Sequence, residues 1–126
     1  MKKRDFLKTS LAAASSAFIP KSLMSMGKTY DKLRTAHIGV GGMGAADLNS
    51  IASHPDVIVV GLCDVDSDAI YKASASYPNA KIYKDYRLML KEMVDEIDAV
   101  VVSTPDHTHA PASIVAMEIN KPVYCQ

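Results

Sequence analysis

The stretch that decides the fold is Ala36-His37-Ile38-Gly39-Val40-Gly41-Gly42-Met43-Gly44. Residues 36–40 predict a short strand, and an apolar stripe with roughly helical spacing predicts a helix over residues 43–53. The glycines between them have the spacing Gly-x-Gly-x-x-Gly, which is informative where a strand turns directly into a helix. A plain strand–turn–helix corner needs one or two glycines, whereas this one has four in six positions. The surplus indicates a loop whose backbone approaches a phosphate group.

Each residue of this loop has an expected role. Gly39 allows the tight turn, Gly41 lets the backbone approach a pyrophosphate, and Gly44 lets the helix pack close to the sheet. Gly42 and Met43 lie at the helix start, where free backbone amides bind phosphate oxygens without any lysine. We therefore predict that these five residues bind a dinucleotide cofactor.

Strand-like and helical segments alternate along the rest of the chain. Apolar runs predict strands over residues 57–63, 81–83, 99–103 and from 122 onward, with helices over about 67–77, 85–93 and 108–119. Asp66 or Ser67 is expected to cap the first of these helices, and Asp85 the second. Right-handed crossovers then favour an α/β fold, a Rossmann-type doubly wound parallel sheet with strand order 3-2-1-4-5. Cys63 and Cys125 fall on strands two and five, too far apart for a disulfide.

A carboxylate follows the second predicted strand. Asp64 lies twenty residues after Gly44, where an acidic side chain accepts hydrogen bonds from the adenosine ribose hydroxyls. The alternative is a cap for the next helix, for which Asp66 and Ser67 are better placed. Asp64 and Asp66 together repel a 2′-phosphate and no arginine is nearby, so we expect NAD rather than NADP.

A third candidate segment, residues 103–109, follows the fourth strand, beside the point where the strand order reverses. Thr104 begins the turn and Pro105 carries the chain over the cofactor, while Asp106 and His109 could reach its ribose or nicotinamide end. The alternative makes Asp106 a helix cap and both histidines exposed first-turn residues. We favour that alternative for His107 and leave both readings open for His109.

The remaining histidines and the last helix have simpler interpretations. No cysteine or glutamate cluster joins His107 and His109, so no metal site is predicted, and His37 and His54 are expected to be structural. Pro111 is expected in the first turn of the last helix, where a missing N–H is tolerated, and Asn120 should end that helix in a left-handed conformation. A chain that stops as the fifth strand ends is expected to be the N-terminal piece of a longer protein.

Composition and charge narrow the function classes. The 126 residues are 48% hydrophobic and carry no net charge, an ordinary globular composition. Residues 1–34, however, have a balance of +6 and residues 35–126 a balance of −6. An acidic body is a poor partner for a phosphate backbone, which argues against nucleic-acid binding. No apolar run is long enough to predict a permanent membrane span.

The basic residues gather in an export-like leader. Lysines and an arginine precede a short apolar stretch over residues 11–19 that Pro20 ends, and residues 20–34 read as a linker. The segment Lys3-Arg4-Asp5-Phe6-Leu7-Lys8 resembles a twin-arginine export motif with lysine in place of the first arginine. We therefore predict a signal and linker over residues 1–34, a binding domain over 35–126, and a periplasmic or exported location. The alternative is an amphipathic N-terminal helix on a cytoplasmic protein.

These motifs together resemble the N-terminal half of the Gfo/Idh/MocA family of oxidoreductases. The matching residues are Gly39–Gly44, residues 63–66 and 98–102, Thr104-Pro105-Asp106 with His109, and residues 121–126. The family has Asn where Asp106 stands, and a Glu-Lys-Pro triplet after the fifth strand, whose Lys acts near the nicotinamide. Gln126 occupies the Glu position, so the resemblance implies that this chain holds cofactor-binding residues and no catalytic one. Any homo-oligomer would form through the further domain that the family carries.

The resemblance implies an exported oxidoreductase that transfers a hydride between NAD and a carbohydrate-like small molecule, such as a sugar or polyol. Exported family members also include NAD-dependent glycosidases that oxidise, eliminate and re-reduce a sugar. A non-catalytic nucleotide-binding module is the remaining alternative. The first two differ in whether NADH accumulates with substrate.

Overall fold

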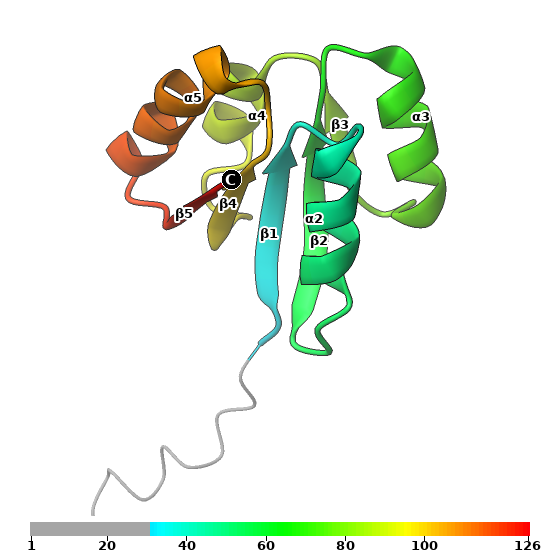
Figure 1. The fold of residues 1–126 in the computed structure, drawn as a ribbon. Coiled ribbons are helices and arrows are strands. Elements are labelled where there is room, and N and C mark those ends of the chain that lie inside the picture. The colour runs from blue at the N-terminus through cyan, green and yellow to red at the C-terminus, as the bar shows by residue number, and fades with distance from the viewer. Residues whose placement is uncertain (1–30) are drawn as a thin grey trace, which may run out of the picture. The chain divides into compact units, whose positions relative to one another are not determined.

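A parallel sheet with strand order β3-β2-β1-β4-β5 forms the centre of the computed structural model, which describes residues 31–126 (Figure 1). The strands are β1 (Leu33–Ile38), β2 (Val57–Cys63), β3 (Lys81–Tyr83), β4 (Ala99–Val102) and β5 (Val123–Cys125). The helices are α2 (Met43–Ala52), α3 (Ser67–Ser76), α4 (Tyr86–Glu92) and α5 (Asp106–Glu118). The predicted fold class and strand order are confirmed. The predicted export signal lies outside the described residues.

The helices cover the two faces of the sheet in pairs. Residues of α2 and α3, such as Leu48 and Ala73, pack with Val59 and Leu62 of β2 in one apolar cluster. Helices α4 and α5 contribute to a second cluster around Ile38, together with Val100 and Val102 of β4. Because helices cover both faces of the sheet, side chains on both faces of the inner strands are buried. The inner strands are therefore nearly continuous hydrophobic runs. All strands run parallel, so their carboxyl ends share one edge.

Strand β1 begins earlier than predicted. It runs over Leu33–Ile38 rather than residues 36–40, so two residues assigned to the linker belong to the sheet. We had interpreted residues 20–34 as a linker because they contain Pro, Gly, Ser and four basic residues, one of which is Arg34. Its guanidinium pairs with Asp98, with 2.8 Å between Nη2 and Oδ1, and the Leu33 N–H donates to the Asp56 carbonyl at 2.7 Å.

Helix α5 also begins earlier than predicted. Pro105 occupies the N-cap position without a side-chain cap, so the reading of Asp106 as a helix cap is wrong. The fixed φ of Pro105, here −56°, allows the chain to enter the helix directly. Pro111 is consequently the sixth residue of α5 and not in its first turn, which leaves the His107 carbonyl without its usual helical donor.

Other local predictions agree with the structure. Asp66 caps α3 by accepting from the Asp68 N–H at 2.9 Å, and Asp85 caps α4 by accepting from the Arg87 N–H at 2.8 Å. Asn120 has a positive φ of 57° after α5. Cys63 and Cys125 are free thiols on strands separated by β1 and β4. Within residues 31–126 no helix has the length and apolarity needed to cross a bilayer.

Candidate functional site

The glycine turn joins β1 to α2 at the carboxyl edge of the sheet. Gly39 and Gly42 have φ angles of 85° and 52°, which side chains rarely adopt. A Cβ atom on Gly39 would lie 2.5 Å from the carbonyl oxygen of Ser103, which follows β4. A Cβ atom on Gly44 would lie 2.3 Å from the carbonyl oxygen of Gly39. The tight turn expected at Gly39 and the close helix packing expected at Gly44 therefore both depend on contacts between backbone atoms.

Gly41 lies beside α3 and the Asp64 carboxylate. A Cβ atom there would lie 3.1 Å from the Ala69 Cβ and 3.9 Å from the Asp64 Oδ2. A side chain would therefore extend toward α3 and the carboxylate after β2. The absence of a side chain keeps open the space beside Asp64, where we expected a ribose.

Asp64 connects the glycine turn to the start of α3. Its Oδ2 accepts from the Val40 N–H at 2.9 Å, and its Oδ1 accepts from the Asp66 N–H at 3.0 Å. Asp66, not Asp64, caps the helix, so the capping alternative for Asp64 is wrong. Each carboxylate oxygen retains acceptor capacity beyond its backbone partner. The carboxylate is thus held in place and can still accept from hydroxyl groups.

A cleft of about 420 Å³ at this edge collects several predicted site residues. Its lining includes Gly39, Gly41, Asp64, Thr104 and Pro105, which come from loops after β1, β2 and β4. The volume lies within the range of about 300–1,000 Å³ common for small-molecule sites. The other predicted residues are absent from the lining: Gly42, Met43, Gly44, Asp106 and His109.

The loop after β4 contains an unusual pair of polar groups. The Oγ1 of Thr104 is buried and has no hydrogen-bond partner within residues 31–126. The Nε2 of His109 lies in hydrogen-bond contact with the Thr104 carbonyl oxygen, so the part-buried imidazole is turned onto its own loop. His109 is therefore not the exposed residue of the alternative reading, and it does not line the cleft.

Sequence reasoning missed several residues of the cleft. Val65, Lys84 and Tyr86 line it, and so does His107, which is exposed in the first turn of α5 as we expected. Lys84 lies in the loop after β3 and Tyr86 is the first residue of α4, and no motif singled out either residue. The available signal was positional, since loops after parallel strands share the carboxyl edge of the sheet.

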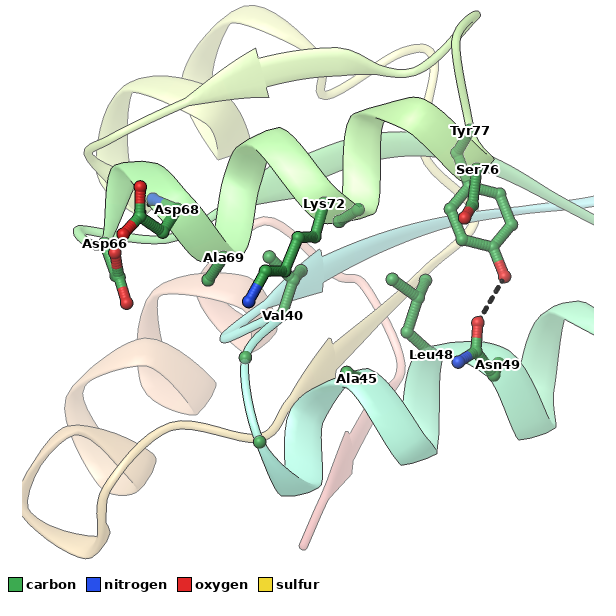
Figure 2. Close-up of a pocket in the computed structure, with 13 residues that line it drawn as sticks. Val40, Ala45, Leu48, Asn49, Asp66, Asp68, Ala69, Lys72, Ser76 and Tyr77 are labelled. Atoms are coloured by element: carbon green, nitrogen blue, oxygen red, sulfur yellow. Dashed lines mark hydrogen bonds between the residues drawn. The ribbon is translucent and has the colours of Figure 1, made fainter.

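A second cavity, of about 360 Å³, is a groove between α2 and α3 (Figure 2). Val40 and Leu48 contribute to its apolar lining, and the Lys72 side chain reaches from α3 over Val40. The Tyr77 hydroxyl donates to the Asn49 Oδ1 at 3.1 Å across the two helices. Asp64 and Thr104 do not line this groove, so the cleft is the candidate site.

The buried titratable groups near the sheet are unsuited to acid–base or nucleophilic chemistry. Burial raises the pKa of the Cys63 thiol to about 12, which keeps it protonated. Burial lowers the pKa of His37 to about 4, and its Nε2 lies 3.0 Å from the Thr35 Oγ1. The exposed His54 accepts from the Asp56 N–H in a turn. In residues 31–126 no three His, Cys, Asp or Glu side chains are grouped to hold a metal ion.

Strand order, the glycine turn into α2 and a carboxylate directly after β2 define the class, a dinucleotide-binding Rossmann domain. Residues 33–126 match the family model described as the GFO_IDH_MocA oxidoreductase family, NAD-binding Rossmann fold. The chain belongs to this family, as its motifs indicated.

Two curated relatives illustrate the range of the family. A glycosyl hydrolase family 109 protein of Stenotrophomonas maltophilia is 33% identical over 100% of this chain and 29% of its own length. An inositol 2-dehydrogenase of Salmonella typhimurium is 27% identical over 75% of this chain and 28% of its own. The chain therefore spans less than a third of these relatives.

Solved structures agree with this assignment. Myo-inositol dehydrogenase from Lactobacillus casei, in complex with NAD(H) and myo-inositol, aligns with a TM-score of 0.68 and 27% identity, covering 75% of this chain and 28% of that one. The WlbA dehydrogenase from Bordetella pertussis, with NADH and UDP-GlcNAcA, aligns at 0.63 and 25%, with the same coverage of each chain.

The residues present fit NAD. The carboxylate of Asp64 has acceptor capacity for ribose hydroxyls, and Gly41 leaves the space beside it open. The Met43 N–H, the first of α2, has no acceptor within the helix and suits a phosphate oxygen. Thr104 and Pro105 line the same cleft.

Proposed function

We propose that the protein carrying this chain is an NAD-dependent oxidoreductase that transfers a hydride between the cofactor and a sugar, polyol or related hydroxyl compound. The observation that carries this proposal is the meeting of Gly41, Asp64 and Thr104 in one cleft. When bound, NAD supplies the hydride chemistry at its nicotinamide ring. The residues of this chain bind and orient it.

Each part of the cleft has a distinct role in that binding. Asp64 accepts from the adenosine ribose, and its two backbone hydrogen bonds fix the carboxylate before the cofactor arrives. The start of α2 holds the pyrophosphate through backbone amides. The loop of Thr104 and Pro105 covers the cofactor, and the hydrogen-bond contact of the His109 Nε2 with the Thr104 carbonyl oxygen holds this loop in place. His109 is therefore a positioning residue in this proposal, not a cofactor ligand.

The substrate class rests on the relatives. The Lactobacillus casei enzyme was solved with myo-inositol and the Bordetella pertussis enzyme with UDP-GlcNAcA, and both ligands carry ring hydroxyls. We further propose that the catalytic lysine implied by the family resemblance follows Gln126, outside this chain. Self-association through the same further region belongs to this proposal.

Calorimetric titration of NAD into the chain tests the binding role directly. We expect one NAD per chain, with binding weakened more than tenfold in Asp64→Ala. Asp68→Ala is the matched control, because it removes a nearby carboxylate that does not line the cleft. Its NAD affinity should stay within twofold of wild type. A wild-type chain that binds no NAD would contradict the proposed function.

A second candidate is an NAD-dependent glycoside hydrolase that oxidises its sugar, eliminates the leaving group and reduces the product again. It is favoured by the relative that covers the whole chain, a glycosyl hydrolase family 109 protein. The two activities differ in their NADH balance. An oxidoreductase accumulates NADH with substrate, whereas the hydrolase releases sugar without net NADH. NAD binding with neither activity would indicate a non-catalytic module.

We also propose that the protein is exported through the twin-arginine route. The support is the leader itself, with Lys3-Arg4 ahead of the apolar stretch over residues 11–19. Replacing Lys3 and Arg4 with glutamine should leave the precursor in the cytoplasm, as cell fractionation would show. Unchanged export of this double variant would instead favour the amphipathic-helix interpretation.

A further inference from the structure

We infer that Lys84 sets how strongly the proposed NAD site excludes NADP, an inference that rests on the proposed function. Lys84 lies in the loop after β3 and lines the same cleft as Asp64 and Gly41. Its Nζ donates to the Ser67 Oγ at 3.0 Å, at the first residue of α3. The structure thus places a cation in the lining of the cleft, where the sequence had indicated acidic side chains only.

Hydrogen bonds to the start of α3 connect both Asp64 and Lys84 to neighbouring residues of the chain. Asp64 is tied to the next loop because its Oδ1 accepts from the Asp66 N–H. Ser67 directly follows Asp66 and holds the Lys84 Nζ. Ribose hydroxyls that bind Asp64 would therefore lie in the cleft that Lys84 also lines. A 2′-phosphate replaces one of those hydroxyls and adds about two negative charges there.

The charges around this point oppose one another. Asp64, Asp66 and Asp68 disfavour a 2′-phosphate and therefore predict a preference for NAD. Lys84 forms no salt bridge within the described part of the chain, so its charge is available to a ligand. We therefore expect the chain to bind NAD more tightly than NADP while retaining measurable NADP affinity through Lys84.

Lys72 provides the matched control. It is also an exposed lysine, but it reaches from α3 into the groove between α2 and α3 (Figure 2). It does not line the cleft that contains Asp64. Removing the Lys72 charge tests whether a lysine outside the cleft affects NADP binding as strongly as Lys84 does.

The experiment titrates NAD and NADP separately into the wild-type chain, Lys84→Gln and Lys72→Gln. Lys84→Gln should weaken NADP binding more than fivefold beyond any change in NAD binding, whereas Lys72→Gln should leave the ratio of the two dissociation constants within twofold. Raising the salt concentration should weaken NADP binding more than NAD binding in wild type, and less so in Lys84→Gln. Thermal unfolding of each variant monitors the fold.

An Asp64→Ser background keeps the test decisive where wild-type NADP binding is too weak to measure. It removes the main repulsion, so NADP affinity should rise and adding Lys84→Gln should remove most of the gain. An equal effect of Lys84→Gln on both nucleotides, or an NADP loss in Lys72→Gln alone, would overturn the inference. Wild-type chain that binds neither nucleotide would refute the proposed function itself, so the two failures are distinguishable.

Discussion

The outer and inner glycines of one turn serve different purposes. Side-chain carbons at Gly39 and Gly44 would come within 2.5 and 2.3 Å of backbone carbonyl oxygens. At Gly41 the nearest atom would be 3.1 Å away, in the Ala69 side chain, and at Gly42 nothing lies within 4 Å. The outer pair is required by close backbone packing, and Gly42 is required by its φ of 52°, while Gly41 keeps space open beside Asp64 in the cleft. A single sequence motif thus combines a packing requirement with a binding requirement.

The largest expected effect is on the packing side. Gly44→Ala should destabilise the chain by about 3 kcal/mol, because the new carbon meets the backbone oxygen of Gly39. The gain in helix propensity, about 1 kcal/mol, is too small to compensate. Urea unfolding followed by circular dichroism measures the change. A midpoint equal to that of wild type would show that the turn can shift and that the outer glycines are not a folding requirement.

A second effect on the packing side depends on pH. Burial holds the pKa of His37 at about 4, whereas the unfolded chain has the ordinary value of 6.5. The unfolded state therefore binds more protons between these values, so stability is full above pH 6.5 and falls as the pH drops toward 4. The loss should reach about 3 kcal/mol at most.

Urea unfolding across this pH range tests the assignment. His37→Gln should flatten the acid limb between pH 6.5 and 4, while the exposed His54→Gln should keep it. Asp98, whose pKa the Arg34 guanidinium lowers to about 2, contributes only below this window. An unchanged acid limb in His37→Gln would mean that another group carries it.

The element bounds divide into those that the local sequence predicts and those that depend on tertiary contacts. The bounds of β2 were predicted because a continuous apolar run lies between Asp56 and Asp64. The bounds of β1 and α5 were missed because the Arg34–Asp98 pair and the entry of Pro105 into the helix are tertiary or conformational facts. Charge and helix propensity along the chain do not encode either one.

The candidate site divides in the same way. The carboxyl edge could be predicted, since parallel strands bring their following loops together. Lys84 and the brace of His109 on Thr104 could not, because they depend on where side chains point. The role of Asp64 in holding the Val40 and Asp66 amides was equally hidden.

Asp64 has both a packing role, through its two backbone hydrogen bonds, and a predicted binding role toward the ribose. Its variants should therefore separate the effect on stability from the effect on NAD affinity. Asp64→Ala should weaken NAD binding more than tenfold and NADP binding less, because the repulsion of a 2′-phosphate goes with the carboxylate. It should also destabilise the chain by about 1–2 kcal/mol, since two backbone amides lose their acceptor.

Asp64→Asn is the sharper variant. Its amide oxygen can still accept from one backbone N–H, so more stability should remain, while the charged contact to the ribose is lost. Calorimetry with both nucleotides, together with urea unfolding, measures the two effects. If both variants keep wild-type NAD affinity, Asp64 is a structural residue of the loop and does not bind the ribose.

The smallest expected effect on stability lies at Gly41. Its φ is not in the left-handed region, and its nearest obstacle is the side-chain methyl of Ala69 at 3.1 Å. Gly41→Ala should therefore change the free energy of unfolding by less than about 1 kcal/mol. NAD affinity should nevertheless fall several-fold, because the new methyl group points toward the Asp64 carboxylate and narrows the ribose space.

A double variant distinguishes the two contacts of that methyl group. Adding Ala69→Gly relieves the contact with α3 but leaves the methyl beside Asp64, so the loss of NAD affinity should persist. Gly41→Val extends the same test and should abolish binding of both NAD and NADP in a chain that still unfolds cooperatively. Recovery of NAD affinity in Gly41→Ala/Ala69→Gly would place the effect on the packing side. In that case Gly41, like Gly39 and Gly44, would be required for packing, and it would not be needed to keep space open for the ribose.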